Sequence, residues 1–197
     1  ADGGRKNLLV CRPHSNTTID LTAGGKGAGK TAVAGDLLPN EVKCLRFYNA
    51  DELARGLSPL DPPAAAIKAG RLLLTEIRES IHRKETFALE STLSGKTHSR
   101  IFEGALAEGY EIELHYLWLA KPEQAIARVR RRVRLGGHDV PVLDIRRRFN
   151  RSRIHLIDHY LPLATRWAIW DSRGFAAKRL ATSTTDEVDS VRQLIES

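Results

Sequence analysis

The sequence GGKGAGKT at residues 24–31 has the required residue at every fixed position of the pattern G-x-x-x-x-G-K-[ST]. Its glycines let backbone N–H groups point inward around a phosphate, and the positive end of the next helix faces the same anion. Lys30 is expected to reach the β- and γ-phosphates, and Thr31 to offer its hydroxyl to magnesium. The predicted nucleotide-binding residues are Gly24, Gly25, Lys26, Gly27, Ala28, Gly29, Lys30 and Thr31.

Segments of strand and helix character alternate along the whole chain. Strands are expected at 17–23, 44–49, 86–91, 110–120, 167–172 and 178–182, and helices at 30–38, 61–83, 99–108, 122–135, 142–160 and 186–196. This alternation predicts an α/β fold, a parallel sheet with helices on both faces. A strand before GGKGAGKT and a helix after it make a functionless glycine-rich loop a poor alternative. A second Gly-Lys-Thr at 95–97 has Glu90 where the pattern needs glycine, which indicates a turn.

The first predicted strand is unusually polar. Residues 17–23 include Asp20 and three threonines, whereas a central parallel strand is normally almost wholly apolar. The more apolar run at 7–11 lies too far upstream to lead directly into the loop. The assignment of 17–23 as the strand before the loop therefore rests on the loop pattern more than on its own composition.

Size and composition are those of a globular protein. The chain has 197 residues, 42% of them hydrophobic, and we expect residues 1–197 to form a single domain. No apolar run approaches the roughly 20 residues of a membrane span, and the first residues show no signal-peptide pattern. Two cysteines, Cys11 and Cys44, make no disulfide framework. These features predict a cytoplasmic location and no membrane partner.

Two carboxylates follow predicted strands. Asp51 comes just after the strand at 44–49, and Glu90 lies near the end of the strand at 86–91. Ligands of such sheets bind at the carboxyl ends of the strands, so both side chains are expected near the phosphate loop. Asp51 is a candidate base for an attacking hydroxyl, although it could instead, or in addition, cap the helix that begins there. Glu90 is a candidate to hold magnesium through water, because a buried carboxylate needs a metal or a cationic partner.

The basic residues are concentrated in residues 128–153. Ten of these 26 residues are arginine and none is lysine, and with Asp139 and Asp144 the segment carries a charge of +8. The net charge of the chain is +7, so the rest sums to −1. A nucleic-acid binder usually spreads its charge over a wide face, which makes nucleic acid an unlikely partner and predicts a local role for the arginines.

The arginine-rich segment is predicted to form a lid at about 122–160. Two amphipathic helices flank the flexible turn Gly136-Gly137-His138 and bring arginines together around it. The planar fork of arginine binds phosphate oxygens bidentately, which suits a lid over a nucleotide. RNA binding by an arginine-rich helix is an alternative. His155 and His159 have the i, i+4 spacing of zinc ligands, but no third ligand is evident.

Five stretches occur in an order that resembles a known family. They are GGKGAGKT (24–31), NADELARGLSP (49–59), LESTLSGKTH (89–98), the segment 128–153 and YLPLATRWAIWDS (160–172). Together they resemble the zeta-toxin family of P-loop kinases, in particular its small chromosomal members, over about residues 22–172. One departure is Ser172, where the family pattern leads us to expect asparagine after the aspartate.

The resemblance implies a P-loop kinase fold and an activity. Members of that family use ATP and magnesium to phosphorylate the amino-sugar hydroxyl of UDP-N-acetylglucosamine, and an antitoxin protein is a candidate partner. By resemblance, the catalytic residues are Asp51, Lys30, Arg132 and Arg148, the substrate-binding residues are Asn49, Asp51, Glu90 and Thr92, and the metal ligands are Thr31 and Glu90. Two alternatives stay open: a kinase of another small hydroxyl compound, such as an antibiotic or nucleoside, and a nucleotide-dependent RNA-binding protein. Steep loss of affinity with salt would indicate the RNA binder.

Overall fold

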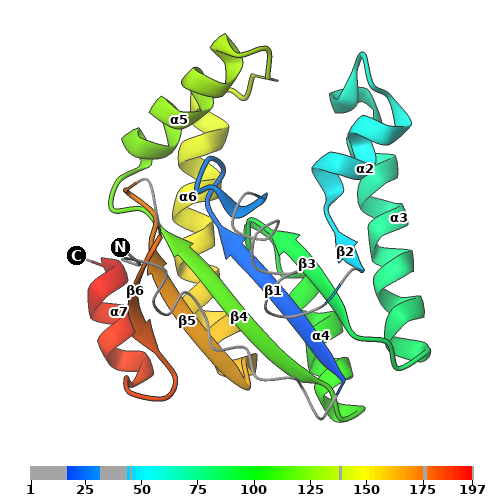
Figure 1. Ribbon diagram of the computed structural model, residues 1–197, viewed down its shortest axis with the longest axis vertical. Helices are drawn as coiled ribbons and strands as arrows, with labels where there is room; N and C mark the ends of the chain where they lie inside the picture. The colour runs from blue at the N-terminus through cyan, green and yellow to red at the C-terminus, as the bar shows by residue number, and fades with distance from the viewer. Residues whose placement is uncertain (1–16, 32–43, 45, 138, 175–176, 197) are drawn as a thin grey trace, which may run out of the picture.

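The computed structural model describes residues 17–31, 44, 46–137, 139–174 and 177–196, and its centre is a six-stranded sheet (Figure 1). The strand order is β2-β3-β1-β4-β5-β6. The strands are β1 (Thr18–Gly24), β2 (Phe47–Tyr48), β3 (Phe87–Ser91), β4 (Glu111–Trp118), β5 (Arg166–Asp171) and β6 (Lys178–Thr182). All pairs are parallel except β5 with β6. The predicted α/β fold with a mostly parallel sheet is confirmed.

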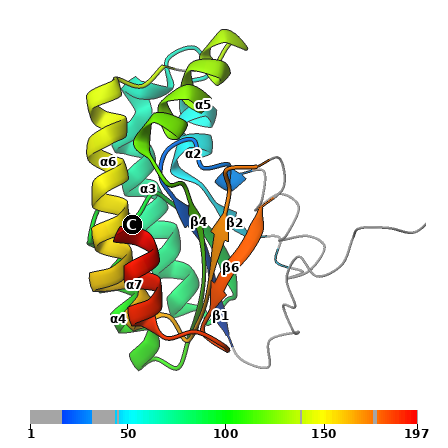
Figure 2. The same ribbon diagram turned by 90° about the vertical axis from the view of Figure 1, so that its left-hand side faces the viewer.

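The described helices lie on one side of this sheet (Figure 2), whereas the sequence predicted helices on both faces. They are α2 (Ala50–Leu57), α3 (Pro62–His82), α4 (Thr97–Ala107), α5 (Pro122–Arg134), α6 (Val142–His155) and α7 (Val188–Glu196). The helix expected at 30–38 is helical at Lys30 and Thr31, and its remainder lies outside the described residues, as do Cys11 and His138. Within the described part of the chain, no helix is long and apolar enough to cross a membrane.

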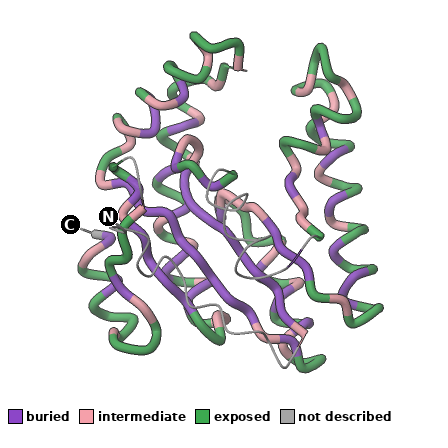
Figure 3. The backbone as a smooth tube through the Cα atoms, viewed as in Figure 1, coloured by how far each residue is buried: buried purple, intermediate pink, exposed green. Residues whose placement is uncertain are grey.

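The polar first strand is the central β1, and its polar residues all lie on one face of the sheet. Because side chains alternate along a strand, Ile19 and Leu21 enter the main core under the helices, while Asp20 and Thr22 point to the opposite face. Both polar residues are buried, as is the whole of β1, which is coloured as buried in Figure 3. The assignment of this strand is therefore correct, and its polar character belongs to the face away from the described helices.

The base of the arginine-rich segment is part of the folded core. Ile126 and Val129 of α5 and Phe149 of α6 are buried in one cluster with Ala28 of the loop and Leu117 of β4. In contrast to these apolar residues, Arg130 and Arg131 of α5 are exposed. This packing holds the buried face of α5 and α6 against the phosphate loop, and the lid at about 122–160 stays a prediction.

Several element boundaries differ from the sequence-based expectation. The predicted strand at 44–49 is reduced to Phe47–Tyr48, because Asn49 already serves as the N-cap of α2. The helix expected at 142–160 ends as an α-helix at His155 and continues as a π-helical turn over Leu156–Tyr160. Helix α4 begins at Thr97, two residues earlier than expected.

Candidate active site

The phosphate loop connects β1 to the start of the next helix, and close packing requires glycine at two of its positions. Gly24 has φ +148°, and a Cβ there would lie 2.7 Å from the carbonyl oxygen of Leu117. Gly27 has φ +85°, and its Cβ would lie 3.0 Å from the carbonyl oxygen of Ala125 on α5. Residues with a side chain rarely adopt these φ values. The loop backbone can therefore approach β4 and α5 this closely only with glycine at these two positions. This is the cradle that the loop pattern predicts.

Lys30 is the buried cation of the loop. Its side chain is 5% exposed, and its Nζ donates to the carbonyl of Gly25 at 3.3 Å and lies 3.6 Å from Oε1 of Glu90. Burial lowers the pKa of Lys30, and Glu90 acts in the opposite direction. A phosphate bound in the loop would add a further negative charge that favours the ammonium form.

Glu90, Thr31 and Asn49 converge from three elements. The Thr31 hydroxyl donates to Oε2 of Glu90 at 2.6 Å, and the Asn49 amide donates to the same oxygen at 2.9 Å. The structure thus brings together the two predicted metal ligands, although they are 59 positions apart. Among the described residues there is no group of three or more histidines, cysteines or carboxylates that could hold a metal.

This donor set fits magnesium bound together with a nucleotide. Mg²⁺ prefers oxygen ligands and usually takes only one or two from the protein, with waters and phosphate oxygens completing its shell. The hydroxyl of Thr31 and the carboxylate of Glu90 are such oxygens, and they lie at the mouth of the phosphate loop. The zinc alternative at His155 and His159 finds no third ligand among the described residues. Nδ1 of His155 instead lies 2.8 Å from the carbonyl oxygen of Leu93.

Asp51 lies in the first turn of α2, across the pocket from the loop. Its carboxylate contacts the ammonium of Lys26 and its side chain is 60% exposed. Partial desolvation would raise the pKa of Asp51, but Lys26, Lys30 and Arg132 together hold the pKa below its ordinary value. An ionised, accessible carboxylate at this point can accept a proton from a bound hydroxyl.

The helix cap belongs to another residue. Oδ1 of Asn49 accepts hydrogen bonds from the backbone N–H groups of Asp51 at 2.9 Å and Glu52 at 3.3 Å. The alternative role considered for Asp51, that of N-cap, is therefore wrong. The sequence contains the signal, since asparagine at position 49 is as good an N-cap as aspartate at position 51.

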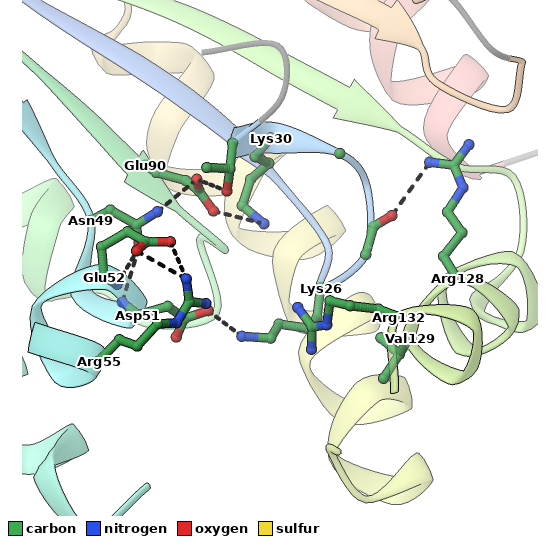
Figure 4. A pocket seen from close by; sticks show the side chains of 13 residues that line it. Lys26, Lys30, Asn49, Asp51, Glu52, Arg55, Glu90, Arg128, Val129 and Arg132 are labelled. Carbon is green, nitrogen blue, oxygen red and sulfur yellow. Dashed lines mark hydrogen bonds and ion pairs between the residues drawn. The ribbon is translucent and has the colours of Figure 1, made fainter. Parts of the chain in front are cut away.

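One pocket of about 240 Å³ brings most of the predicted site residues together (Figure 4). It is lined by Lys26, Gly27, Gly29, Lys30, Thr31, Asn49, Asp51, Glu52, Arg55, Glu90, Arg128, Val129 and Arg132. Arg132 is among these lining residues, and its catalytic role stays a prediction. Arg148 on α6 and Thr92 after β3 are partly buried and are not among the lining residues.

Arg128 is a pocket residue that the sequence analysis did not select. Its guanidinium donates to the carbonyl oxygens of Gly27 and Ala28, each at 3.3 Å, and to that of Ser172. It thereby ties α5 to the phosphate loop and to the end of β5. The i, i+4 spacing of Arg128 and Arg132 was a usable signal, because it places both on one face of α5.

We expect Arg132→Lys to lower turnover more than ATP affinity. Lysine keeps the charge but loses the planar fork, so the substitution tests geometry against charge. An arginine on a transferring phosphate is worth up to about 10³–10⁵ in rate in the best-studied GTPases, and neighbouring cations should make the loss smaller here. The measurement is steady-state kinetics with ATP and the accepted acceptor.

Arg130→Lys is the matched control, because Arg130 is on the same helix, is exposed and is not among the residues that line the pocket. Equal, small effects at Arg130 and Arg132 would contradict a role on phosphate. Arg148→Lys belongs in the same series. A loss comparable with that of Arg132→Lys would support the predicted catalytic role of Arg148.

The central strand β1 of a mostly parallel sheet leads into this loop, and Glu90 lies near the end of the adjacent β3. This arrangement is that of the P-loop kinase fold, and solved structures agree. A chain from the PezAT chromosomal toxin–antitoxin system of Streptococcus pneumoniae superposes with a TM-score of 0.61 at 17% identity, covering 93% of this chain and 79% of that one. The AvrRxo1-ORF1:-ORF2 complex with ATP gives 0.64 at 17% identity over 92% of this chain, which spans 64% of that one. Deoxyadenosine kinase from M. mycoides with bound dATP gives 0.50 at 12% identity, covering 92% and 100%. The fold implied by the resemblance is thus confirmed.

A sequence relative shows the family. An uncharacterized protein of Haemophilus influenzae is 30% identical over 134 residues, which are 68% of this chain and 91% of that protein. The chain therefore belongs to the same family as this Haemophilus influenzae protein. No family model matches it.

Proposed function

We propose that this protein is an ATP-dependent kinase that phosphorylates a hydroxyl group of a small molecule, with UDP-N-acetylglucosamine as the acceptor. The observation that carries the proposal is the placement of the Asp51 carboxylate in one pocket with Lys30 and the phosphate loop. A phosphate site and a proton acceptor that face one solvent-accessible pocket are what hydroxyl phosphorylation requires.

The proposed reaction is a direct transfer between two bound substrates. The acceptor O–H bond breaks as its proton passes to a carboxylate oxygen of Asp51. The acceptor oxygen forms a bond to the γ-phosphorus, the bond from that phosphorus to the β–γ bridging oxygen breaks, and ADP leaves. Lys30 and Arg132 both line the pocket and would stabilise negative charge on the transferring group.

Magnesium would be held by Thr31 and Glu90 and, when bound, would supply charge neutralisation on the β- and γ-phosphates. Asn49 supports this set, because its amide holds the same Glu90 oxygen that the Thr31 hydroxyl contacts. We therefore propose that Asn49 orients the Glu90 carboxylate. Its side-chain oxygen caps α2, and its side-chain nitrogen donates to Glu90.

The charge of the pocket supports anionic substrates. Its lining includes five basic side chains, those of Lys26, Lys30, Arg55, Arg128 and Arg132, against three acidic ones, those of Asp51, Glu52 and Glu90. Such a surplus of positive charge attracts a nucleoside triphosphate and suits an acceptor that carries a diphosphate of its own. The identity of the sugar nucleotide rests on the resemblance of the five sequence stretches, with Thr92 proposed as a further acceptor contact.

The test is an incubation of the purified chain with ATP, magnesium and a panel of UDP-sugars, with mass spectrometry to detect an added phosphate. The panel also includes nucleosides and hydroxylated antibiotics, which represent the other kinase alternative. We expect phosphorylation of UDP-N-acetylglucosamine on its amino sugar. Phosphorylation of another compound instead would overturn the acceptor, and the absence of transfer to every compound would overturn the kinase.

A protein partner belongs to the same proposal. Because a chain with this fold comes from a toxin–antitoxin system of Streptococcus pneumoniae, we propose that this kinase is restrained by an antitoxin. Expression of the chain alone should then slow growth, and the Lys30→Ala variant should not. Equal growth of cells that express either form would contradict this part of the proposal.

A further inference from the structure

The phosphate loop contains a second lysine at a position that its pattern leaves variable. Lys26 occupies one of the four x positions of G-x-x-x-x-G-K-[ST], between Gly25 and Gly27. Its side chain is only 12% exposed, and its ammonium contacts Oδ2 of Asp51, 25 positions further along the chain. Figure 4 shows Lys26 extending from the loop toward Asp51. The nucleotide-binding pattern itself requires no such contact.

Among the cations near Asp51, Lys26 differs from Arg55 and Lys30 in the group that it contacts. From the loop, Lys26 and Lys30 face the carboxylate, and from α5 so does Arg132. On α2 itself, Arg55 donates to both carboxylate oxygens of Glu52, at 2.9 Å and 3.0 Å, and Glu90 is engaged by Thr31 and Asn49. Lys30 is in turn held by Gly25 and Glu90. Lys26 is therefore in direct contact with Asp51 while Arg55 and Lys30 contact other groups.

We propose that Lys26 is a positioning residue that holds the Asp51 carboxylate aimed at the acceptor hydroxyl, and so couples the phosphate loop to the base. This inference rests on the proposed kinase function. When Asp51 takes the acceptor proton, the carboxylate loses its charge. The ammonium of Lys26 then remains beside the phosphoryl group, where negative charge develops on the oxygens.

A double-mutant cycle tests whether Lys26 acts through Asp51. A small displacement of a catalytic group can cost about 10²-fold, so we expect Lys26→Met to lower kcat by about 10- to 100-fold. In an Asp51→Asn background the same change should alter kcat by no more than about twofold, because the group on which Lys26 acts is already gone. Any change in the KM for ATP that comes from the lost positive charge should be the same in both backgrounds. A full loss of kcat in the Asp51→Asn background would overturn the proposal.

Arg55→Met is the matched control for this cycle. It also removes one positive charge from the pocket lining, but its guanidinium is paired with Glu52. Its effect, whatever its size, should therefore multiply with that of Asp51→Asn. If the effect of Arg55→Met on kcat also disappeared in the Asp51→Asn background, the coupling would reflect the charge of the pocket in general. Lys26 would then have no special role.

A second measurement does not depend on turnover. The pKa of Asp51 is followed by carbon NMR of its carboxyl group in the full chain, with thermal unfolding to show that each variant is folded. An opposite charge in contact lowers the pKa of a carboxyl group by about 1–3 units, so Lys26→Met should raise that of Asp51 by about one unit while Lys30 and Arg132 remain. Lys26→Arg should keep the wild-type value.

The two proposals fail separately. An Asp51 pKa that does not move in Lys26→Met would refute the role of Lys26, even in an active kinase. A wild-type chain that phosphorylates no acceptor would refute the kinase function, and the Asp51 titration would then still decide whether Lys26 controls this carboxylate.

Discussion

The Lys30→Ala variant is expected to transfer no measurable phosphate while its sheet and helices remain intact. The Lys30 ammonium is the buried cation of the loop and would neutralise charge on the transferring group, for which a methyl group offers no substitute. Its contacts are polar ones, to the Gly25 carbonyl and to Glu90, and the apolar clusters do not include it. Turnover with ATP and circular dichroism of the same preparation measure the two expectations.

The chain provides a matched control for this variant in its second Gly-Lys-Thr. Lys96 stands between Gly95 and Thr97, as Lys30 stands between Gly29 and Thr31, but it is exposed and precedes α4 away from the pocket lining. Lys96→Ala should therefore keep wild-type turnover. A Lys30→Ala protein with near wild-type turnover would end the kinase interpretation of the site.

The Asp51→Asn variant is expected to lose about 10²–10⁴-fold in turnover, with ATP affinity little changed. General-base catalysis typically contributes a factor of this size, and asparagine preserves the shape of the side chain while removing its ability to take a proton. Because Asn49 caps α2, the substitution leaves both cap hydrogen bonds in place. Steady-state kinetics and thermal unfolding of the variant separate loss of chemistry from loss of stability.

Asp61→Asn serves as the comparison. Asp61 caps α3 by accepting from the backbone N–H of Ala64 at 3.3 Å, it is exposed, and it is not among the residues that line the pocket. It should affect stability slightly, since asparagine is an equally good N-cap, and turnover not at all. If Asp51→Asn behaved like Asp61→Asn, with full turnover per folded molecule, Asp51 would not be the base.

Much of the site could be predicted because its signals are local. The loop pattern names Lys30 and Thr31 directly, and the rule that ligands meet the carboxyl ends of parallel strands was enough to place Asp51 and Glu90 near them. The convergence of Thr31 with Glu90 follows from β1 and β3 being neighbours in the sheet. Pairing of β1 with β3 brings the residues at the ends of these strands close together, and this does not depend on how the helices pack.

The arginines were harder to assign because their roles depend on how two helices pack. Every arginine of residues 128–153 has the same chemistry, and helical spacing offers several equivalent faces. The burial of Val129 and Phe149 against the loop decides which face of α5 looks into the pocket, and it selects Arg128 and Arg132. The same packing leaves Arg148 outside the lining in this structure.

The fold class, the phosphate loop and the position of β1 before it follow from the amino-acid sequence, because each depends on neighbouring residues or on a repeating pattern. Three other features depend on tertiary packing: Lys26 contacts Asp51, Arg128 donates to carbonyl oxygens of the loop, and the polar side of β1 faces away from the described helices. These contacts join residues that are 25 to about 100 positions apart. They arise from the order of the strands in the sheet and from the packing of α2 and α5. A local sequence pattern predicts neither.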